Sequence, residues 1–420
     1  MKKIILACAL LAAMTANAQM TKEEKAAMKE AQSVVKKAQS TYNGAVKNEQ
    51  SGRKETNFEK MDPAREMIKP ALTNQYTKDD AHTWQVAADI EYQYYLKYDV
   101  EAKADESRKP LLLEAAYNTA NYCMTFDNLY QQQAKKPEEA QAQHKRYQQM
   151  GANPLLVCLQ AAQGLSSSDN QEEVKQGVKY ATVAYNGLAK SHLMSDFENP
   201  SKADWISYSK AFLAQSLSNL KTSTDAEVEA AYAELVGTKF ESTAYQALAM
   251  RFKDKNHDKY VEYLKKGLAS LAPSEPVYAN IAIMLMQDQY HNDKKACLET
   301  IQLIKQNLPD NDNTVRAYLM EGQIYFDQKD YKKAEQTFQE AVEKYPNETE
   351  AITMPAKCAW QNALTTNKKE DTQHAIDMFA QLEQKYPDSP EYWGEALYIL
   401  YNNSNQLEKA KPYKKYYSAK

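Results

Sequence analysis

Regularly spaced breaks in the second half of the chain constrain its fold more than any other feature of the sequence. Prolines accompanied by small polar residues interrupt the chain at Pro273, Pro309, Pro346 and Pro387, at intervals of 36, 37 and 41 residues. Between the breaks, apolar residues recur every three or four positions, which predicts helices. An interval of this length that holds two helices predicts a solenoid, because one helical hairpin cannot bury its apolar face and a stack of hairpins can.

A shortage of glycine supports an all-α fold class. The chain has 10 glycines in 420 residues, about a third of the usual share of roughly 7%. Nucleotide-binding loops and tight β-turns depend on glycine, so most α/β and all-β enzyme folds are disfavoured. No segment alternates apolar and polar residues for long enough to predict a strand. We therefore expect an α-solenoid of antiparallel helical hairpins.

One segment, from Val315 to Pro346, carries a specific repeat pattern. It resembles the tetratricopeptide repeat, whose pattern is W-x2-L-G-x2-Y, then A-x3-F, then P. The matching positions have the family's spacing throughout: Tyr318, Gly322, Tyr325, Ala334, Phe338, Ala341 and Pro346. Two residues depart from the pattern, namely Tyr318 in place of Trp and Glu321 in place of Leu. We expect Gly322 to lie where the two helices cross closely.

The repeat pattern weakens toward the N-terminus, which suggests two regions. Residues 240–420 repeat the pattern in several hairpins, whereas residues 19–235 have longer helical segments with divergent spacing. Helices in the second part of the N-terminal region are predicted over 111–133, 154–165, 174–192 and 205–220. We therefore expect a divergent, TPR-like helical-hairpin region over 19–235 and a tetratricopeptide array over 240–420.

Residues 1–18 have the pattern of a secretory signal peptide. A basic start precedes a short apolar stretch, and Ala16 and Ala18 form a small-x-small cleavage motif. The mature chain would begin at Gln19. Cys8 lies too early for a lipoprotein signal, because cleavage there would leave almost no apolar stretch. No later stretch is long enough for a membrane helix, so we predict an exported, periplasmic protein, with outer-membrane association or secretion as alternatives.

The charge distribution argues against a nucleic-acid partner. The net charge is −4, which becomes −6 when the two lysines of the signal peptide are removed, and no region is strongly basic. Only the end of the chain, Lys411–Tyr417, is locally basic and aromatic. We interpret it as a solvated last helix, with a membrane or anionic-polymer contact as the alternative.

Residues that could carry chemistry are scattered along the chain. No two of the six histidines lie within four positions of each other, and no nucleotide-loop, hydrolase or zinc motif is present. An acidic pattern that begins at Asp310 has Val315 where a calcium loop requires glycine, so a helix cap is favoured there. We therefore predict no catalytic residues, no metal and no cofactor.

The cysteines and a tyrosine cluster are interpreted as packing residues. The four cysteines after the signal peptide lie in apolar helical segments, which predicts free buried thiols. If one disulfide forms, Cys123 and Cys158 are the candidate pair. Four tyrosines crowd one predicted helix: Tyr92, Tyr94, Tyr95 and Tyr98. Packing is favoured for them, and a sugar- or peptide-stacking patch is the alternative.

The resemblance to the tetratricopeptide repeat implies a protein-interaction scaffold. In such arrays the first helices of the hairpins line a concave groove that holds an extended peptide or a partner helix. The matching groove positions in this sequence are Thr243, Gln246, Met250, Tyr278, Ile281, Leu285, Arg316, Leu319, Gln323 and Phe326. Family members that grip a C-terminal carboxylate use a set of Lys, Asn and Arg side chains, of which only Arg316 is matched here, so that activity is not carried over. We predict a non-enzymatic scaffold of the bacterial cell envelope that binds a protein or peptide partner.

A glycan-binding or nutrient-uptake accessory role at the outer membrane is the alternative function. Outer-membrane glycan-binding proteins of gut Bacteroidetes contain similar helical repeats, and this chain resembles exported repeat proteins of that group. Those proteins usually carry long glycine- and aromatic-rich insertions, which this chain lacks. An enzyme is the least favoured class, since no set of residues meets the geometric requirements of catalysis even in outline. The sequence leaves the partner's identity and the oligomeric state open.

Overall fold

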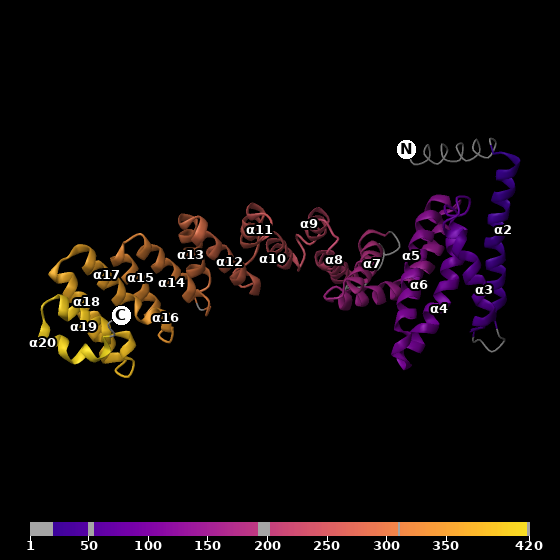
Figure 1. Cartoon of the computed structure of the whole chain (residues 1–420). Coiled ribbons are helices and arrows are strands. Elements are labelled where there is room, and N and C mark those ends of the chain that lie inside the picture. The colour runs from indigo at the N-terminus through magenta and orange to yellow at the C-terminus, as the bar shows by residue number, and fades with distance from the viewer. Residues whose placement is uncertain (1–19, 49–53, 192–201, 310, 418–420) are drawn as a thin grey trace. The chain divides into compact units, whose positions relative to one another are not determined.

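The computed structural model describes residues 20–48, 54–191, 202–309 and 311–417. The chain divides into two compact units, one that ends at Phe240 and one formed by Glu241–Lys420. Each unit is a succession of helices, as the apolar periodicity predicts (Figure 1). The predicted signal peptide and its cleavage site lie outside the described residues.

The first unit is built from long helices. Its elements are α2 (Lys22–Ala45), β1 (Val46–Asn48), β2 (Lys54–Thr56), α3 (Phe58–Ile68), η1 (Lys69–Leu72), α4 (Ala81–Ala104), η2 (Glu106–Arg108), α5 (Lys109–Gln133), α6 (Pro137–Leu165), α7 (Gln171–Tyr185), η3 (Asn186–Lys190), α8 (Lys202–Asn219) and α9 (Asp225–Ala233). Helices α4, α5 and α6 have 24, 25 and 29 residues. Neighbouring helices pack against one another in chain order. Their crossings bury many alanines together with Tyr94, Phe126 and Tyr147.

Two features of the first unit differ from the sequence-based prediction. A short antiparallel hairpin of β1 and β2 connects α2 to α3; strands of three residues are too short to show an alternating pattern. The helix predicted over 154–165 begins instead at Pro137, and Pro154 lies inside α6. Proline usually ends a helix because it lacks a backbone N–H. Buried residues on both sides of it, Met150 and Leu155 among them, keep α6 continuous through packing.

The second unit is a stack of shorter antiparallel hairpins. Its elements are α10 (Glu241–Phe252), α11 (His257–Ser270), α12 (Pro276–Asn292), α13 (Lys294–Asn307), α14 (Thr314–Asp327), α15 (Tyr331–Lys344), α16 (Thr349–Ile352), α17 (Met354–Thr366), α18 (Lys369–Lys385), η5 (Pro390–Tyr392), α19 (Gly394–Asn403), α20 (Leu407–Ala410) and η6 (Lys411–Tyr416). Each long helix packs against the next, and the first helices α10, α12 and α14 also contact one another in succession. The predicted all-α solenoid of antiparallel hairpins is therefore confirmed.

Close helix crossings in this unit occur at glycines. A Cβ atom on Gly322 of α14 would lie 2.6–2.8 Å from three carbons of the Phe338 ring on α15. Phe338 and its neighbour Ala334 are fully buried, so the ring cannot move aside cheaply. Gly267 of α11 has the same role, because a Cβ there would lie 2.9 Å from Ile281 of α12. The close crossing expected at Gly322 is confirmed.

The cysteines and the tyrosine cluster are packing residues, as predicted. All four described cysteines are free and buried, and the candidate pair is not joined: Cys123, Cys158, Cys297 and Cys358. In the tyrosine cluster on α4, Tyr94, Tyr95 and Tyr98 are buried. They therefore form core and not a stacking patch.

The basic, aromatic end of the chain folds back onto α19. Tyr413 and Tyr416 meet the indole of Trp393 edge-on, with ring centroids 6.1 and 5.3 Å away. The Tyr413 hydroxyl donates a hydrogen bond of 2.8 Å to Glu383 on α18. Gly394 lies directly beneath Tyr416, because a Cβ there would lie 2.8 Å from the ring. This segment caps the last apolar face of the unit, whereas the sequence predicted a solvated helix.

Candidate functional site

The residues predicted to line a groove divide between the core and the surface of the second unit. Tyr278, Ile281 and Leu285 of α12 are buried, with 4%, 0% and 2% of their surface exposed. Tyr278 packs in the apolar cluster of α12, α13 and α14, and its hydroxyl accepts a hydrogen bond of 2.8 Å from the amide of Asn307. Contrary to the prediction, these three side chains are buried and present almost no surface to a partner.

The predicted residues on α10 and α14 lie nearer the surface. Thr243, Met250 and Arg316 are exposed, and Gln246, Leu319, Gln323 and Phe326 are half-buried. The Met250 side chain is 51% exposed. The guanidinium of Arg316 forms no ion pair with any described residue. Stacking of the hairpins therefore leaves the Arg316 guanidinium and the Met250 thioether exposed on the surface of this unit.

Phe326 is less available to a binding partner than the sequence suggests. Its ring packs in the cluster formed by Tyr325, Ala334 and Phe338 and meets the ring of Tyr331 edge-on, with centroids 5.2 Å apart. Phe326 therefore helps to hold α14 against α15. Of the two predicted groove residues Arg316 and Phe326, only the arginine is exposed.

A polar network beside this surface connects the α12–α13 hairpin to α14. The carboxylate of Asp327 accepts hydrogen bonds from the Lys294 ammonium (2.8 Å), the Gln323 amide (2.7 Å) and the Tyr290 hydroxyl (3.3 Å). The bond from Lys294 is the largest cause that lowers the pKa of Asp327 from its ordinary value. Gln323 is thus held by a neighbour, and it contributes to the site as an oriented amide.

A buried charged cluster near this site was not predicted. Glu321 is 6% exposed, and its carboxylate forms an ion pair with Lys305 of α13. It also accepts hydrogen bonds from the Gln302 amide (2.9 Å) and the Tyr325 hydroxyl (3.3 Å). The signal was available in the sequence, because a glutamate at a buried leucine position of the repeat requires a cation from the neighbouring hairpin. Glu321 is also the twelfth residue counted from Asp310, where a calcium loop has its last ligand. These contacts therefore occupy the carboxylate that would have completed the calcium-loop pattern.

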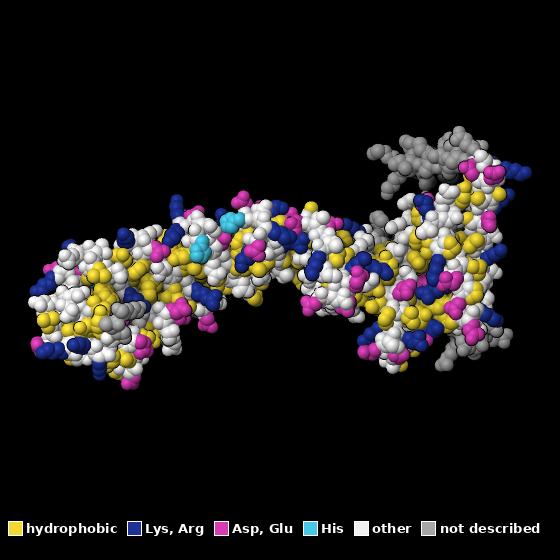
Figure 2. Space-filling view, in the orientation of Figure 1, with side chains coloured by type: hydrophobic (Ala, Val, Ile, Leu, Met, Phe, Trp, Pro, Cys, Tyr) yellow, Lys and Arg dark blue, Asp and Glu magenta, His cyan; other side chains and the backbone are white. Residues whose placement is uncertain are grey.

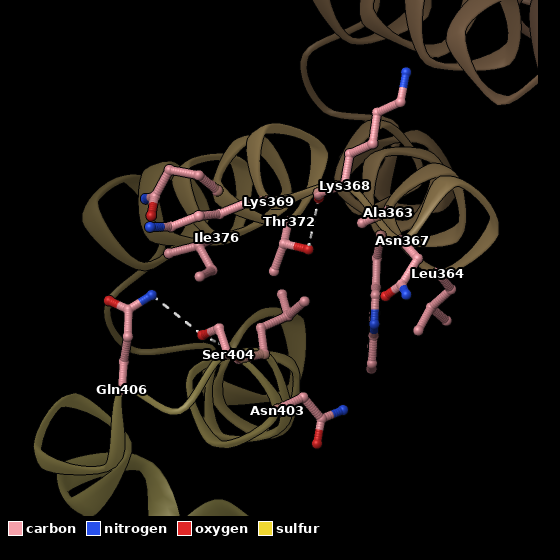
Figure 3. Close-up of a pocket in the computed structure, with 13 residues that line it drawn as sticks. Ala363, Leu364, Asn367, Lys368, Lys369, Thr372, Ile376, Asn403, Ser404 and Gln406 are labelled. Carbon is pink, nitrogen blue, oxygen red and sulfur yellow. Dashed lines mark hydrogen bonds between the residues drawn. The ribbon is translucent and has the colours of Figure 1, made fainter.

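A cavity of about 690 Å³ lies at the other end of this unit, between α17, α18 and α19 (Figure 3). Its lining combines an apolar part, which includes Trp360 and Ile376, with neutral polar side chains and two lysines, Lys368 and Lys369. The sequence did not predict it, because the lining residues extend over 360–406 and only the stacking of the helices brings them together.

Two buried polar contacts in the first unit connect adjacent helices. Arg65 of α3 pairs with Glu91 of α4, and its guanidinium carbon lies 4.3 Å from the ring centroid of Tyr94. Between α5 and α6, Asp127 lies 3.0 Å from the Nδ1 atom of His144. Over the described ranges, no three His, Cys, Asp or Glu side chains are grouped closely enough to hold a metal ion. No helix in the described part of the chain is long and apolar enough to cross a membrane.

Comparison with known proteins identifies one repeat. No curated protein matches the chain in sequence. Among solved structures, the chain is similar to the TPR domain of P58(IPK), with 9% identity, 77% of this chain and 91% of that chain covered, and a TM-score of 0.22. It is also similar to yeast Tom70, with 13% identity, 92% of this chain and 91% of that chain covered, and a TM-score of 0.21. Both TM-scores are below 0.5, so the identification rests on the sequence: residues 315–348, which contain α15 and all of α14 except Thr314, match the tetratricopeptide repeat family.

Proposed function

We propose that the protein is a non-enzymatic scaffold that binds a peptide segment or a helix of another protein. The binding surface is the first-helix face, which we define as the exposed groove positions of α10 and α14: Thr243, Met250 and Arg316. The match of residues 315–348 to the tetratricopeptide repeat supports this proposal. Stacked hairpins present a continuous surface that can bind an extended partner.

The observation that carries the proposal is the exposure of the Arg316 guanidinium. Its guanidinium is exposed and forms no ion pair with a described residue, although it lies on a helix whose other faces are packed. Arginine is enriched among the residues that dominate binding energies at protein interfaces. The flexible thioether of Met250 suits an apolar side chain of the partner.

The surface charge favours a protein partner over a nucleic acid. Basic and acidic side chains are interspersed on the visible face of both units (Figure 2). A nucleic-acid-binding surface would instead show a continuous basic patch. The mixture of charge signs is compatible with a partner that carries both apolar and charged residues.

Site-specific photocrosslinking in cells tests this proposal. A photoreactive residue replaces Arg316 or Met250 on the first-helix face, and Lys332 or Gln336 on the exposed side of α15 serves as the matched control. We expect one discrete partner to crosslink from the first pair and not from the second. Equal crosslinking from both pairs, or crosslinking from the controls alone, would contradict the proposed surface.

We also propose that the scaffold acts in the cell envelope, in the periplasm. The support is the basic start, the short apolar stretch and the small-x-small motif at Ala16–Ala18. Mass spectrometry of the protein from the envelope fraction should find a chain that begins at Gln19. A retained Met1, or a lipid-modified Cys8, would contradict this location.

A further inference from the structure

We propose that the cavity between α17, α18 and α19 is a binding site for a small neutral polyhydroxy compound, such as a mono- or disaccharide. Its volume of about 690 Å³ is within the usual range of ligand pockets, roughly 300–1,000 Å³. The end of α17, the start of α18 and the end of α19 form its walls (Figure 3). The site lies away from the first-helix face and does not depend on the proposed scaffold function.

Part of the cavity lining is apolar and includes an indole. Trp360, Leu364, Ile376 and Leu400 form this part, and Leu364 is 58% exposed. The Trp360 ring is fixed by an edge contact with Phe379, with centroids 5.8 Å apart. Its Nε1 atom is buried and has no hydrogen-bond partner in the described part of the chain. Because this atom is covered by protein, the indole contributes its ring to the cavity lining and not a hydrogen bond.

Apart from Ala363 and two lysines, Lys368 and Lys369, the remaining lining is polar and uncharged. Its uncharged polar members carry an amide or a hydroxyl group: Asn367, Thr372, Gln373, Asn403, Ser404 and Gln406. Amide and hydroxyl groups both donate and accept hydrogen bonds, as the hydroxyls of a sugar do. None of the residues that line the cavity is an aspartate or glutamate.

Two of these amides are free to bind a ligand. The side chains of Asn367 and Asn403 form no hydrogen bond with any described residue. Across the cavity from Asn403, the Thr372 hydroxyl donates to the backbone carbonyl of Lys368 over 3.1 Å (Figure 3). That bond orients the hydroxyl and leaves its oxygen able to accept from a ligand. The cavity therefore offers donors and acceptors on facing walls.

The lining also contains two lysines, Lys368 and Lys369. Lys368 extends away from the centre of the cavity, and Lys369 runs along α18 (Figure 3). Glu370 and Asp371 lie in the same first turn of α18 but not in the cavity lining. The amide and hydroxyl groups are the partners that the cavity offers a neutral saccharide, and the anionic probes below test whether the two lysines favour a phosphate or a carboxylate.

Ligand-observed NMR and titration calorimetry on the full mature chain test the proposal. The probes are glucose, galactose, mannose, N-acetylglucosamine, maltose and cellobiose, with glucuronate and glucose 6-phosphate as anionic counterparts. The test variant is Asn367→Gly with Asn403→Ala; glycine suits position 367 because Asn367 has a φ of 52°. The control is Asn402→Ala, which removes an exposed amide one position away on α19 and outside the cavity lining.

We expect at least one neutral saccharide to bind the wild type and the control alike, and the double variant to bind it at least tenfold more weakly. Both variants should keep the wild-type melting temperature, because neither removes a hydrogen bond within the protein. The proposal would be overturned if no neutral saccharide bound, if only the anionic probes bound, or if the double variant bound as tightly as the control. None of these outcomes bears on the first-helix face, so failure here leaves the scaffold proposal separately testable.

Discussion

At the scale of single residues, Gly322 and Glu321 show two opposite uses of neighbouring positions. Gly322 contributes by having no side chain, which lets the Phe338 ring lie against the backbone of α14. Glu321 contributes a buried charge, which the neighbouring hairpin must neutralise through Lys305. The first residue follows the repeat pattern, so its role could be predicted; the second departs from the pattern, which signals a buried charge but does not identify the cation that neutralises it.

Replacing Gly322 with leucine should destabilise the second unit. The new side chain would overlap the buried Phe338 ring, and such overpacking typically costs about 1–3 kcal/mol. Chemical denaturation should show a lower free energy of unfolding for Gly322→Leu. The same change at the exposed Lys332 on α15 should have little effect. Equal effects at the two positions would show that the α14–α15 crossing is assigned incorrectly.

The buried ion pair of Glu321 predicts a strongly asymmetric mutational response. Lys305→Met alone leaves the buried carboxylate without its cation, which typically costs about 3–5 kcal/mol. Glu321→Leu with Lys305→Met removes both charges and restores the repeat's usual leucine, so its stability should be close to the wild type or above it. Denaturation of both variants measures this difference. A double variant as unstable as the single one would show that the cost of Lys305→Met does not come from the unpaired carboxylate of Glu321.

At the scale of elements, the sequence predicted the hairpins better than their ends. The spacing of Pro273, Pro309 and Pro346 reports where helices stop, because proline and small polar residues both interrupt the helical pattern. For the same reason a helix was wrongly predicted to begin at Pro154, whereas packing on both sides of this residue keeps α6 continuous. The candidate site was predicted least well. Burial of Tyr278 and Ile281 depends on how α12 fits between its neighbours, and repeat register alone does not contain that information.

The C-terminal cap gives a prediction for a whole element. Ending the chain at Ala410 removes Tyr413 and Tyr416, which cover Trp393. The indole would then be exposed to water, so tryptophan emission should shift to longer wavelength and the second unit should lose stability. Substituting only the exposed lysines Lys414 and Lys415 with serine should do neither. An unchanged spectrum after truncation would mean that η6 does not cap the unit.

At the scale of the whole molecule, the two compact units should unfold as two events. Cys123 and Cys158 lie in the first unit, and Cys297 and Cys358 in the second. Burial raises the pKa of Cys297 to about 11 and that of Cys158 and Cys358 to about 12. Folded thiols are therefore protonated at pH 8 and react slowly. Because these pKa values are raised, their contribution to stability is complete below the unfolded value, near 8.5, and is lost as the pH rises through the folded values.

Thiol labelling along a denaturant gradient at pH 8, read by mass spectrometry, measures whether the two units unfold separately. We expect no labelling of the four cysteines without denaturant, and then separate midpoints for the pair in each unit. One common midpoint for all four would indicate a single cooperative molecule. Labelling of any of the four without denaturant would contradict the burial of that thiol.

The measurement that tests the central claim most directly is the affinity of Arg316→Glu for the partner identified by crosslinking. Arg316 is exposed and unpaired among the described residues, so reversing its charge should leave the melting temperature unchanged. An interface anchor is typically worth about 2 kcal/mol, so we expect roughly a thirtyfold weaker affinity. Lys332→Glu makes the same charge change on the exposed side of α15 and should bind as the wild type does. An affinity for Arg316→Glu equal to that of the wild type would contradict binding through the first-helix face.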